Sequence, residues 1–165
     1  MSDHLSATLR IGRSAAEIFD FLRRPEHHSD VDASNVVGPT PNPGPVHRVG
    51  DVFGLEMTWR GEAGETERYL TDNVVTAYEF NRVLEWEVGP AGGAPIGWRW
   101  RYDLHPQSDW ETTVTYSQDW SRASQADRDR FGLPAFSRRE LEASLTLLDL
   151  ALVAAHGDRP HLEDD

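Results

Sequence analysis

Residues 98–104 alternate strictly between large apolar and charged side chains. Trp98, Trp100 and Tyr102 share one parity, and Arg99 and Arg101 share the other. Because successive side chains of a β-strand point to opposite faces, this pattern predicts a strand with one aromatic, buried face and one charged, solvated face. Burial on one face only is typical of antiparallel sheets. The chain therefore needs a fold that covers a single face of its sheet.

The same alternation recurs along the chain. It predicts further strands at residues 4–11, 51–59, 66–76, 83–88 and 113–120. The Gly- and Pro-rich segment 89–97 is typical of a hairpin loop, and segment 105–110 of a turn. On the solvated face we expect cross-strand ion pairs between the glutamates of 83–88 and the arginines of 98–104.

Two capping boxes mark helix starts. Ser14 with Glu17 predicts a helix that ends before Pro25, and Ser137 with Glu140 predicts a second, longer helix. The hydroxyl of each serine accepts a hydrogen bond from a backbone N–H of the first turn, which explains Ser14 without a nucleophilic role. Residues 25–32 are expected to add one short helical turn.

The longer helix is predicted to run from residue 137 to about residue 155, with Gly157 as its cap. It carries an apolar stripe at 4-3-4-3 spacing, formed by Leu141, Leu145, Leu148, Leu152 and Ala155. This stripe is expected to pack on the aromatic face of the sheet. The small residues Ala151, Ala154 and Ala155 are expected to leave room there for a ligand.

The remaining segments connect these elements. Residues 38–48 contain four prolines and predict an extended loop. Residues 122–136 are polar, with a short helical stretch near 124–130, and are expected to act as a mobile cover. We expect one domain over residues 1–165, with a core at about 5–156 and a frayed acidic tail at 157–165.

Composition excludes several functions. The formal net charge of −12 lacks the basic footprint that nucleic acid requires, and it disfavours an anionic membrane surface. No apolar run approaches the length of a membrane span, so we expect a cytoplasmic protein. The chain has no cysteine, and its sixteen basic residues are all arginine. Thiol catalysis, thiolate metal sites and a Schiff-base lysine are thereby excluded, and we predict no cofactor and no metal.

Three stretches together resemble a known superfamily. They are residues 7–31 (ATLRIGRSAAEIFDFLRRPEHHSDV), residues 74–88 (VVTAYEFNRVLEWEV) and residues 97–120 (GWRWRYDLHPQSDWETTVTYSQDW), followed by the final helix. This order resembles the START-like, polyketide-cyclase (SRPBCC) superfamily. The resemblance implies an α+β helix-grip fold, in which a curved antiparallel sheet of about six or seven strands wraps around a long C-terminal helix, with a short N-terminal helical segment. It transfers no catalytic residue.

The resemblance also implies a central cavity lined from the sheet. The candidate ligand-binding residues share the inward parity of their strands or lie before the final helix. They are Phe53, Met57, Trp59, Tyr69, Asn73, Trp86, Trp98, Trp100, Tyr102, Tyr116, Gln118, Trp120 and Phe136. Rigid aromatic rings suit apolar pockets because they expose much apolar area. The alternative reading of the same rings is ordinary core packing.

The sequence leaves two alternatives for the orientation of the 66–76 strand and two for the role of Gln118. If Val75 points inward, Asn73 and Thr71 face the cavity, whereas the opposite register would bury Asp72 and Arg68. We favour the first register because burying charge is costly. Gln118 is either a ligand-orienting amide or a satisfied core residue.

Residues 27–32 contain two histidines and two aspartates, but adjacent loop histidines seldom converge on one metal. We therefore expect a solvated loop near the cavity entrance rather than a metal site.

The sequence thus favours binding of a small hydrophobic ligand, such as an aromatic or polyketide-like molecule, in a central cavity. One alternative is a polyketide aromatase/cyclase-type enzyme that acts in the same cavity. Another is a protein-interaction module, which a closed core without a cavity would favour. The sequence does not determine the oligomeric state.

Overall fold

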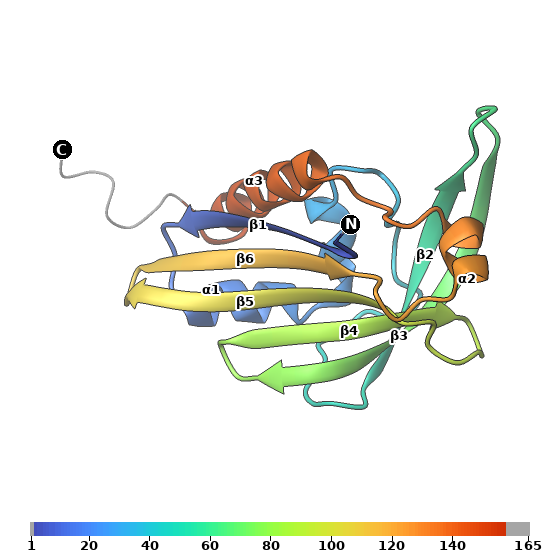
Figure 1. Ribbon diagram of the computed structural model, residues 1–165. Helices are drawn as coiled ribbons and strands as arrows, with labels where there is room; N and C mark the ends of the chain where they lie inside the picture. Colours follow the sequence, from blue (N-terminus) through green and yellow to red (C-terminus); the bar gives the residue numbers. More distant parts are fainter. Residues whose placement is uncertain (1, 158–165) are drawn as a thin grey trace.

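The computed structural model describes residues 2–157 and contains one curved six-stranded sheet (Figure 1). The strands lie in the order β1-β6-β5-β4-β3-β2, and every neighbouring pair is antiparallel. Their bounds are β1 His4–Ile11, β2 Val52–Arg60, β3 Thr66–Glu79, β4 Val83–Pro90, β5 Trp98–Ser108 and β6 Glu111–Asp119. The predicted α+β class and strand number are confirmed.

The helices pack against this sheet, and one of the two predicted capping boxes forms completely; at the other, the Glu17 carboxylate pairs with Arg13 at 3.3 Å instead of with the N–H of Ser14. The helices are α1 Ala15–Leu22, the 3₁₀ helix η1 Pro25–Val31, α2 Gln125–Phe131 and α3 Arg138–His156. Ser14 Oγ accepts from the Glu17 N–H at 3.2 Å, and Ser137 with Glu140 forms the complete capping box. In Figure 1, α3 runs beside β1 and α1 lies behind β5 and β6, consistent with the contacts of α3 with β1 and of α1 with β5.

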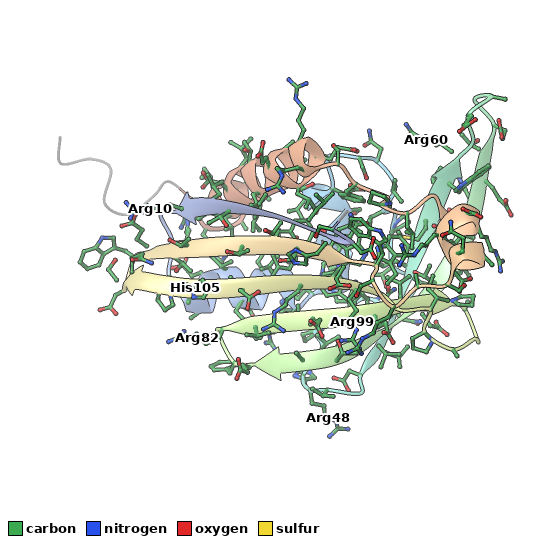
Figure 2. The ribbon with its side chains drawn as sticks, viewed as in Figure 1. Arg10, Arg48, Arg60, Arg82, Arg99 and His105 are labelled. Carbon is green, nitrogen blue, oxygen red and sulfur yellow. The ribbon has the colours of Figure 1, made fainter. Side chains whose placement is uncertain are left out.

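The charged face of the sheet is the one turned toward the viewer in Figure 2, where Arg99 lies over β4 and β5. Its Nε lies 3.1 Å from a Glu87 oxygen, and Arg101 pairs with Glu85 at 3.2 Å. The expected cross-strand ion pairs are confirmed. The aromatic face is therefore the concave one, toward α1 and α3.

The stripe of α3 covers that concave face, but over a shorter length than expected. Leu141, Leu145, Leu148 and Leu152 are buried, whereas Ala154 and Ala155 are exposed. The expectation that these two alanines leave room over the sheet was wrong, because the last turn of α3 has passed the buried part of the sheet.

Several strands extend beyond their predicted bounds, and β4 continues to Pro90, two residues into the segment expected to be a hairpin loop. β5 continues to Ser108, so the turn to β6 holds only residues 109 and 110. Pro106 is tolerated within it because β4 begins at Val83, opposite Asp103, and leaves that stretch of β5 with a free edge. β3 continues to Glu79 through a bulge between Val75 and Ala77, and bulges increase the local bend and twist of a strand.

The Pro-rich loop and the residues just before it cover β2, which is one of the two edge strands of the sheet. The N–H of Thr58 donates to Val36 O at 2.8 Å, and that of Gly38 donates to Glu56 O at 2.7 Å. The loop approaches β2 so closely that a Cβ on Gly38 would lie 2.8 Å from the Glu56 carbonyl oxygen. Segment 36–39 therefore covers β2 and forms one wall of the site described below.

Candidate functional site

The aromatic rings of β4, β5 and β6 pack against one another in the centre of the concave face. Tyr102 and Tyr116 stack in parallel at 4.2 Å, and Trp100 meets Phe136 edge-on at 4.6 Å. Trp98 is fully buried beside Trp100, with ring centres 5.7 Å apart. These rings fill much of the space that the sequence assigned to a ligand, so most of the aromatic wall is core.

A small inner cavity of about 20 Å³ remains among them. Its lining comes from η1, the segment after it and strands β2 to β6. The lining residues are His28, Val31, Asp32, Val37, Leu55, Met57, Asn73, Trp86, Val88, Trp100, Tyr102 and Tyr116. A water molecule needs on the order of 10–15 Å³ of such space. The cavity thus admits one water-sized group and no aromatic ring.

His28 lies inside the core rather than in a solvated loop. Its ring stacks on Trp86 at 5.0 Å and meets Phe53 edge-on at 5.4 Å. Its Nε2–H donates to the Leu22 carbonyl at 2.8 Å. Burial lowers the pKa of His28 from 6.5 to about 4, so the imidazole is neutral at pH 7. The expectation of a solvated loop was wrong here because η1 turns this side chain toward the sheet.

Asp32 is the second titratable group that the loop buries. Its carboxylate accepts from the Ser34 N–H at 2.8 Å, the Ser34 hydroxyl at 2.6 Å and the Val37 N–H at 2.6 Å. Burial raises the pKa of the Tyr102 and Tyr116 hydroxyls above the ordinary range, and the charge of Asp32 adds to this effect. Both tyrosines therefore remain protonated at neutral pH.

The open question of the β3 register is resolved by the burial of Val75, Asn73 and Thr71. The favoured inward register is confirmed. Asn73 Nδ2 donates to the Phe53 carbonyl at 3.1 Å and to Thr71 Oγ1 at 3.0 Å. Both amide hydrogens are thus used within the sheet.

Gln118 is a satisfied core residue rather than a cavity group. Its Oε1 accepts from Trp98 Nε1 at 3.1 Å and from the Ala135 N–H at 3.0 Å. Its Nε2 donates to the Phe136 carbonyl at 3.2 Å. Gln118 therefore ties the segment before α3 to β6.

At one end of the sheet, β2 and β3 lie beside α2 (Figure 1), and the larger open space of the structure is located between them. Two grooves of about 280 and 320 Å³ share three half-buried rings, those of Trp59, Tyr69 and Phe131. We call these rings the mouth trio. Tyr69 and Phe131 lie 5.7 Å apart, and the Arg130 guanidinium lies 5.1 Å above the Phe131 ring. Burial raises the pKa of the Tyr69 hydroxyl to about 12.

The chain is similar to one curated protein in sequence and to several solved structures in fold. No protein-family model matches the chain. It is 28% identical over 119 residues, or 72% of its length, to Uncharacterized protein Rv0088 of Mycobacterium tuberculosis, and it spans about half (48%) of that relative. Protein Ms6760 of Mycobacterium smegmatis superposes with a TM-score of 0.62 at 17% identity over 94% of each chain. The Polyketide_cyc-like protein Cgl2372 of Corynebacterium glutamicum superposes with a TM-score of 0.54 at 18% identity over 98% of each chain.

The chain has the helix-grip fold of the polyketide-cyclase-like proteins. At these identities the likeness shows the fold alone. Within residues 2–157, no helix is both long and apolar enough to cross a membrane. The same residues contain no group of three or more side chains placed to hold a metal ion.

Within this helix-grip fold, the predicted site residues divide into three sets. Met57, Asn73, Trp86, Trp100, Tyr102 and Tyr116 line the inner cavity. Trp59 and Tyr69 line the mouth grooves. The residues that line none of these three spaces are Phe53, Trp98, Gln118, Trp120 and Phe136, all of which are buried.

Sequence reasoning missed His28, Asp32 and Phe131 as members of the site. Phe131 is the only large apolar residue of α2, in a helix that otherwise carries polar side chains and one alanine. A single aromatic residue at the end of a polar helix was the available signal for a contact with the sheet.

Proposed function

We propose that the protein binds a small, flat, apolar molecule at the mouth trio, between the sheet and α2. The observation that carries this proposal is the half-buried state of all three rings, which border two grooves of about 280 and 320 Å³. Ligand sites are typically concave, mostly apolar and at least about 300 Å³ in volume. Trp59, Tyr69 and Phe131 supply the apolar surface for such a ligand.

The expected affinity follows from area. A two-ring aromatic molecule that buries on the order of 200 Å² of apolar surface gains about 5 kcal/mol. That free energy corresponds to a Kd of roughly 0.2 mM. The cost of ordering the ligand and the side chains that it contacts weakens the complex further. A natural ligand with more buried area or with hydrogen bonds would bind more tightly.

Helix α2 would act as the cover of this site. Arg128 holds it through an ion pair with Asp3 at 3.2 Å and a hydrogen bond to the Ala123 carbonyl at 3.0 Å. At its other end, the chain leaves α2 through Gly132, whose φ of 64° is left-handed. Beyond this glycine, Gln118 fixes residues 135 and 136. The cover would therefore be α2 itself, and it would open only when the contacts of Arg128 break.

The geometry supports binding better than cyclisation inside the core. A polyketide chain would need a cavity many times larger than the inner cavity of about 20 Å³. A protein-interaction role would use the mouth surface, and it predicts no response to small aromatic molecules.

The proposal is tested with naphthalene as the probe. We expect it to quench tryptophan fluorescence and to raise the Tm, since a ligand that binds only the folded state stabilises it. Trp59→Ala is expected to abolish most of the stabilisation. Trp110→Ala is the matched control, because Trp110 lies in the β5–β6 turn at the far end of the sheet (Figure 1). No stabilisation of the unmodified protein, or equal losses in both variants, would contradict the proposal.

A further inference from the structure

The groove of about 280 Å³ is bordered by polar groups as well as by the mouth trio. These groups belong to Ser34, Thr58, Trp59, Arg60, Tyr69 and Glu140. Two of them are already engaged, because the Ser34 hydroxyl donates to Asp32 at 2.6 Å and Glu140 Oε1 accepts from the Ser137 N–H at 3.1 Å. The remaining side chains offer a guanidinium, an indole N–H and two hydroxyls, all of which can donate a hydrogen bond to a ligand.

Arg60 is the charged donor of this groove. It is the last residue of β2, and Figure 2 shows its exposed side chain at that end of the strand. Among residues 2–157, no carboxylate lies within ion-pair distance of its guanidinium. The chain contains 28 acidic and 16 basic residues. In such a chain, a guanidinium without a carboxylate partner is open to an anion from outside.

The indole N–H of Trp59 is the neutral donor. Its nitrogen lies close to Gly132, where a Cβ would be 3.8 Å away. Within the described part of the chain, this N–H reaches no acceptor. An indole N–H can only donate, and a tryptophan in a partly buried position usually finds a partner for it. A ligand oxygen in the groove would supply that partner.

Two carboxylates also border the mouth, and their positions decide which groove suits an anion. Glu67 lines the groove of about 320 Å³ together with Arg130, so the two charges there offset each other. Glu140 lines the other groove, but it belongs to the capping box of α3, where the positive end of the helix dipole compensates its charge. The charge of Arg60 is therefore offset least, and the groove of about 280 Å³ favours an anion.

We propose that this groove binds the carboxylate of an aromatic acid through the Arg60 guanidinium and the Trp59 N–H, while the ring of the acid lies against the mouth trio. This inference rests on the proposed function and adds the chemical class of the ligand. A guanidinium matches a carboxylate because both are planar and can form two parallel hydrogen bonds. One ligand can reach both donors because they line the same groove.

An aromatic ammonium ion is the alternative that the net charge of −12 would favour at long range. The local charges oppose it. Arg60 lies in one groove, and the Arg130 guanidinium already occupies a position 5.1 Å above the Phe131 ring. A second cation at the rings would be repelled by both arginines.

The test compares 2-naphthoate, 2-naphthamide and 2-naphthylmethylammonium in NMR titrations of the unmodified protein at pH 7 and low ionic strength. The first two probes share the ring and nearly the same shape, but only the naphthoate carries a negative charge. We expect it to bind about tenfold more tightly than the amide, because hydrogen bonds between charged groups are stronger. Since the net charge of the protein repels an anion, such a preference requires a local cation. The indole proton of Trp59 is expected to shift downfield with the naphthoate.

Arg60→Gln locates the preference. We expect this variant to bind the naphthoate no more tightly than the amide and to bind the amide as before. Arg82→Gln is the matched control, because Arg82 is an exposed arginine in the β3–β4 turn, at the opposite end of the sheet (Figure 2). It makes the same change in net charge and should keep the tenfold preference.

Three outcomes would overturn the carboxylate site and leave the mouth site in place. They are equal binding of the naphthoate and the amide, a preference that survives Arg60→Gln or is lost equally in Arg82→Gln, and tighter binding of the ammonium probe than of the naphthoate. Binding of none of the three probes would overturn both proposals.

Discussion

The burial of His28 predicts a specific dependence of stability on pH. Its pKa is 6.5 in the unfolded chain and about 4 in the folded protein, because burial disfavours the imidazolium. The unfolded state therefore binds more protons between these values, so the contribution of His28 to stability is fully present above pH 6.5. It falls as the pH drops toward 4. A difference of about 2.5 units corresponds to a loss of about 3 kcal/mol.

The variant His28→Phe removes the titrating group and keeps a ring against Trp86 and Phe53. It also leaves the Leu22 carbonyl without its donor, which costs about 1–3 kcal/mol at neutral pH. We expect the unmodified protein to be more stable than the variant at pH 7. That advantage should shrink by about 3 kcal/mol by pH 4, and carboxylates common to both proteins cancel in the comparison.

The measurement is urea unfolding of both proteins at several pH values from 7.5 to 4. Glu26 and His27 are the charged neighbours that contribute to the His28 environment, and both are kept in the variant. A difference in unfolding free energy that stays constant over this range would show that His28 is not a buried neutral imidazole. The inner cavity as described would then be wrong.

Three further predictions concern the fold around the site. Leu145→Asp should unfold the domain or nearly so, because Leu145 is 1% exposed and faces the sheet; a thermal melt close to that of the unmodified protein would refute this packing. Gln118→Leu should speed hydrogen exchange at the Ala135 amide, because that N–H donates to the Gln118 side chain. Unchanged protection of this amide would show that Gln118 does not hold the segment before α3 against β6. Arg128→Ala should speed exchange throughout α2 and leave β5 and β6 unchanged, and equal protection of α2 in both proteins would refute its anchoring by Arg128.

The elements of the fold were predictable because their signals are local. The alternation of apolar and charged residues predicted that Trp98 and Trp100 lie on the buried face of β5. For β3, the cost of burying charge favoured the register in which Asn73 points inward. The capping box at Ser137 marked the start of α3. In each case the neighbours that decide the structure lie within a few residues in sequence.

The site was less predictable because it depends on contacts between distant segments. The sequence suggests that His28 and Asp32 are solvated loop residues, and only the packing of η1 against β2 and β4 shows that they are buried. Nothing local indicates that residues 36–39 bond to β2, since prolines weaken the strand pattern. The size of the inner cavity depends on how Tyr102 and Tyr116 stack, and sequence parity does not specify this packing.

The central claim is that a flat apolar ligand lies between the mouth trio and α2. Intermolecular nuclear Overhauser effects between naphthalene and isotope-labelled protein test it most directly. We expect contacts from the ligand protons to the ring protons of Trp59, Tyr69 and Phe131, and none to Trp110. Contacts confined to other surfaces, or the absence of any at ligand concentrations that approach saturation, would contradict it.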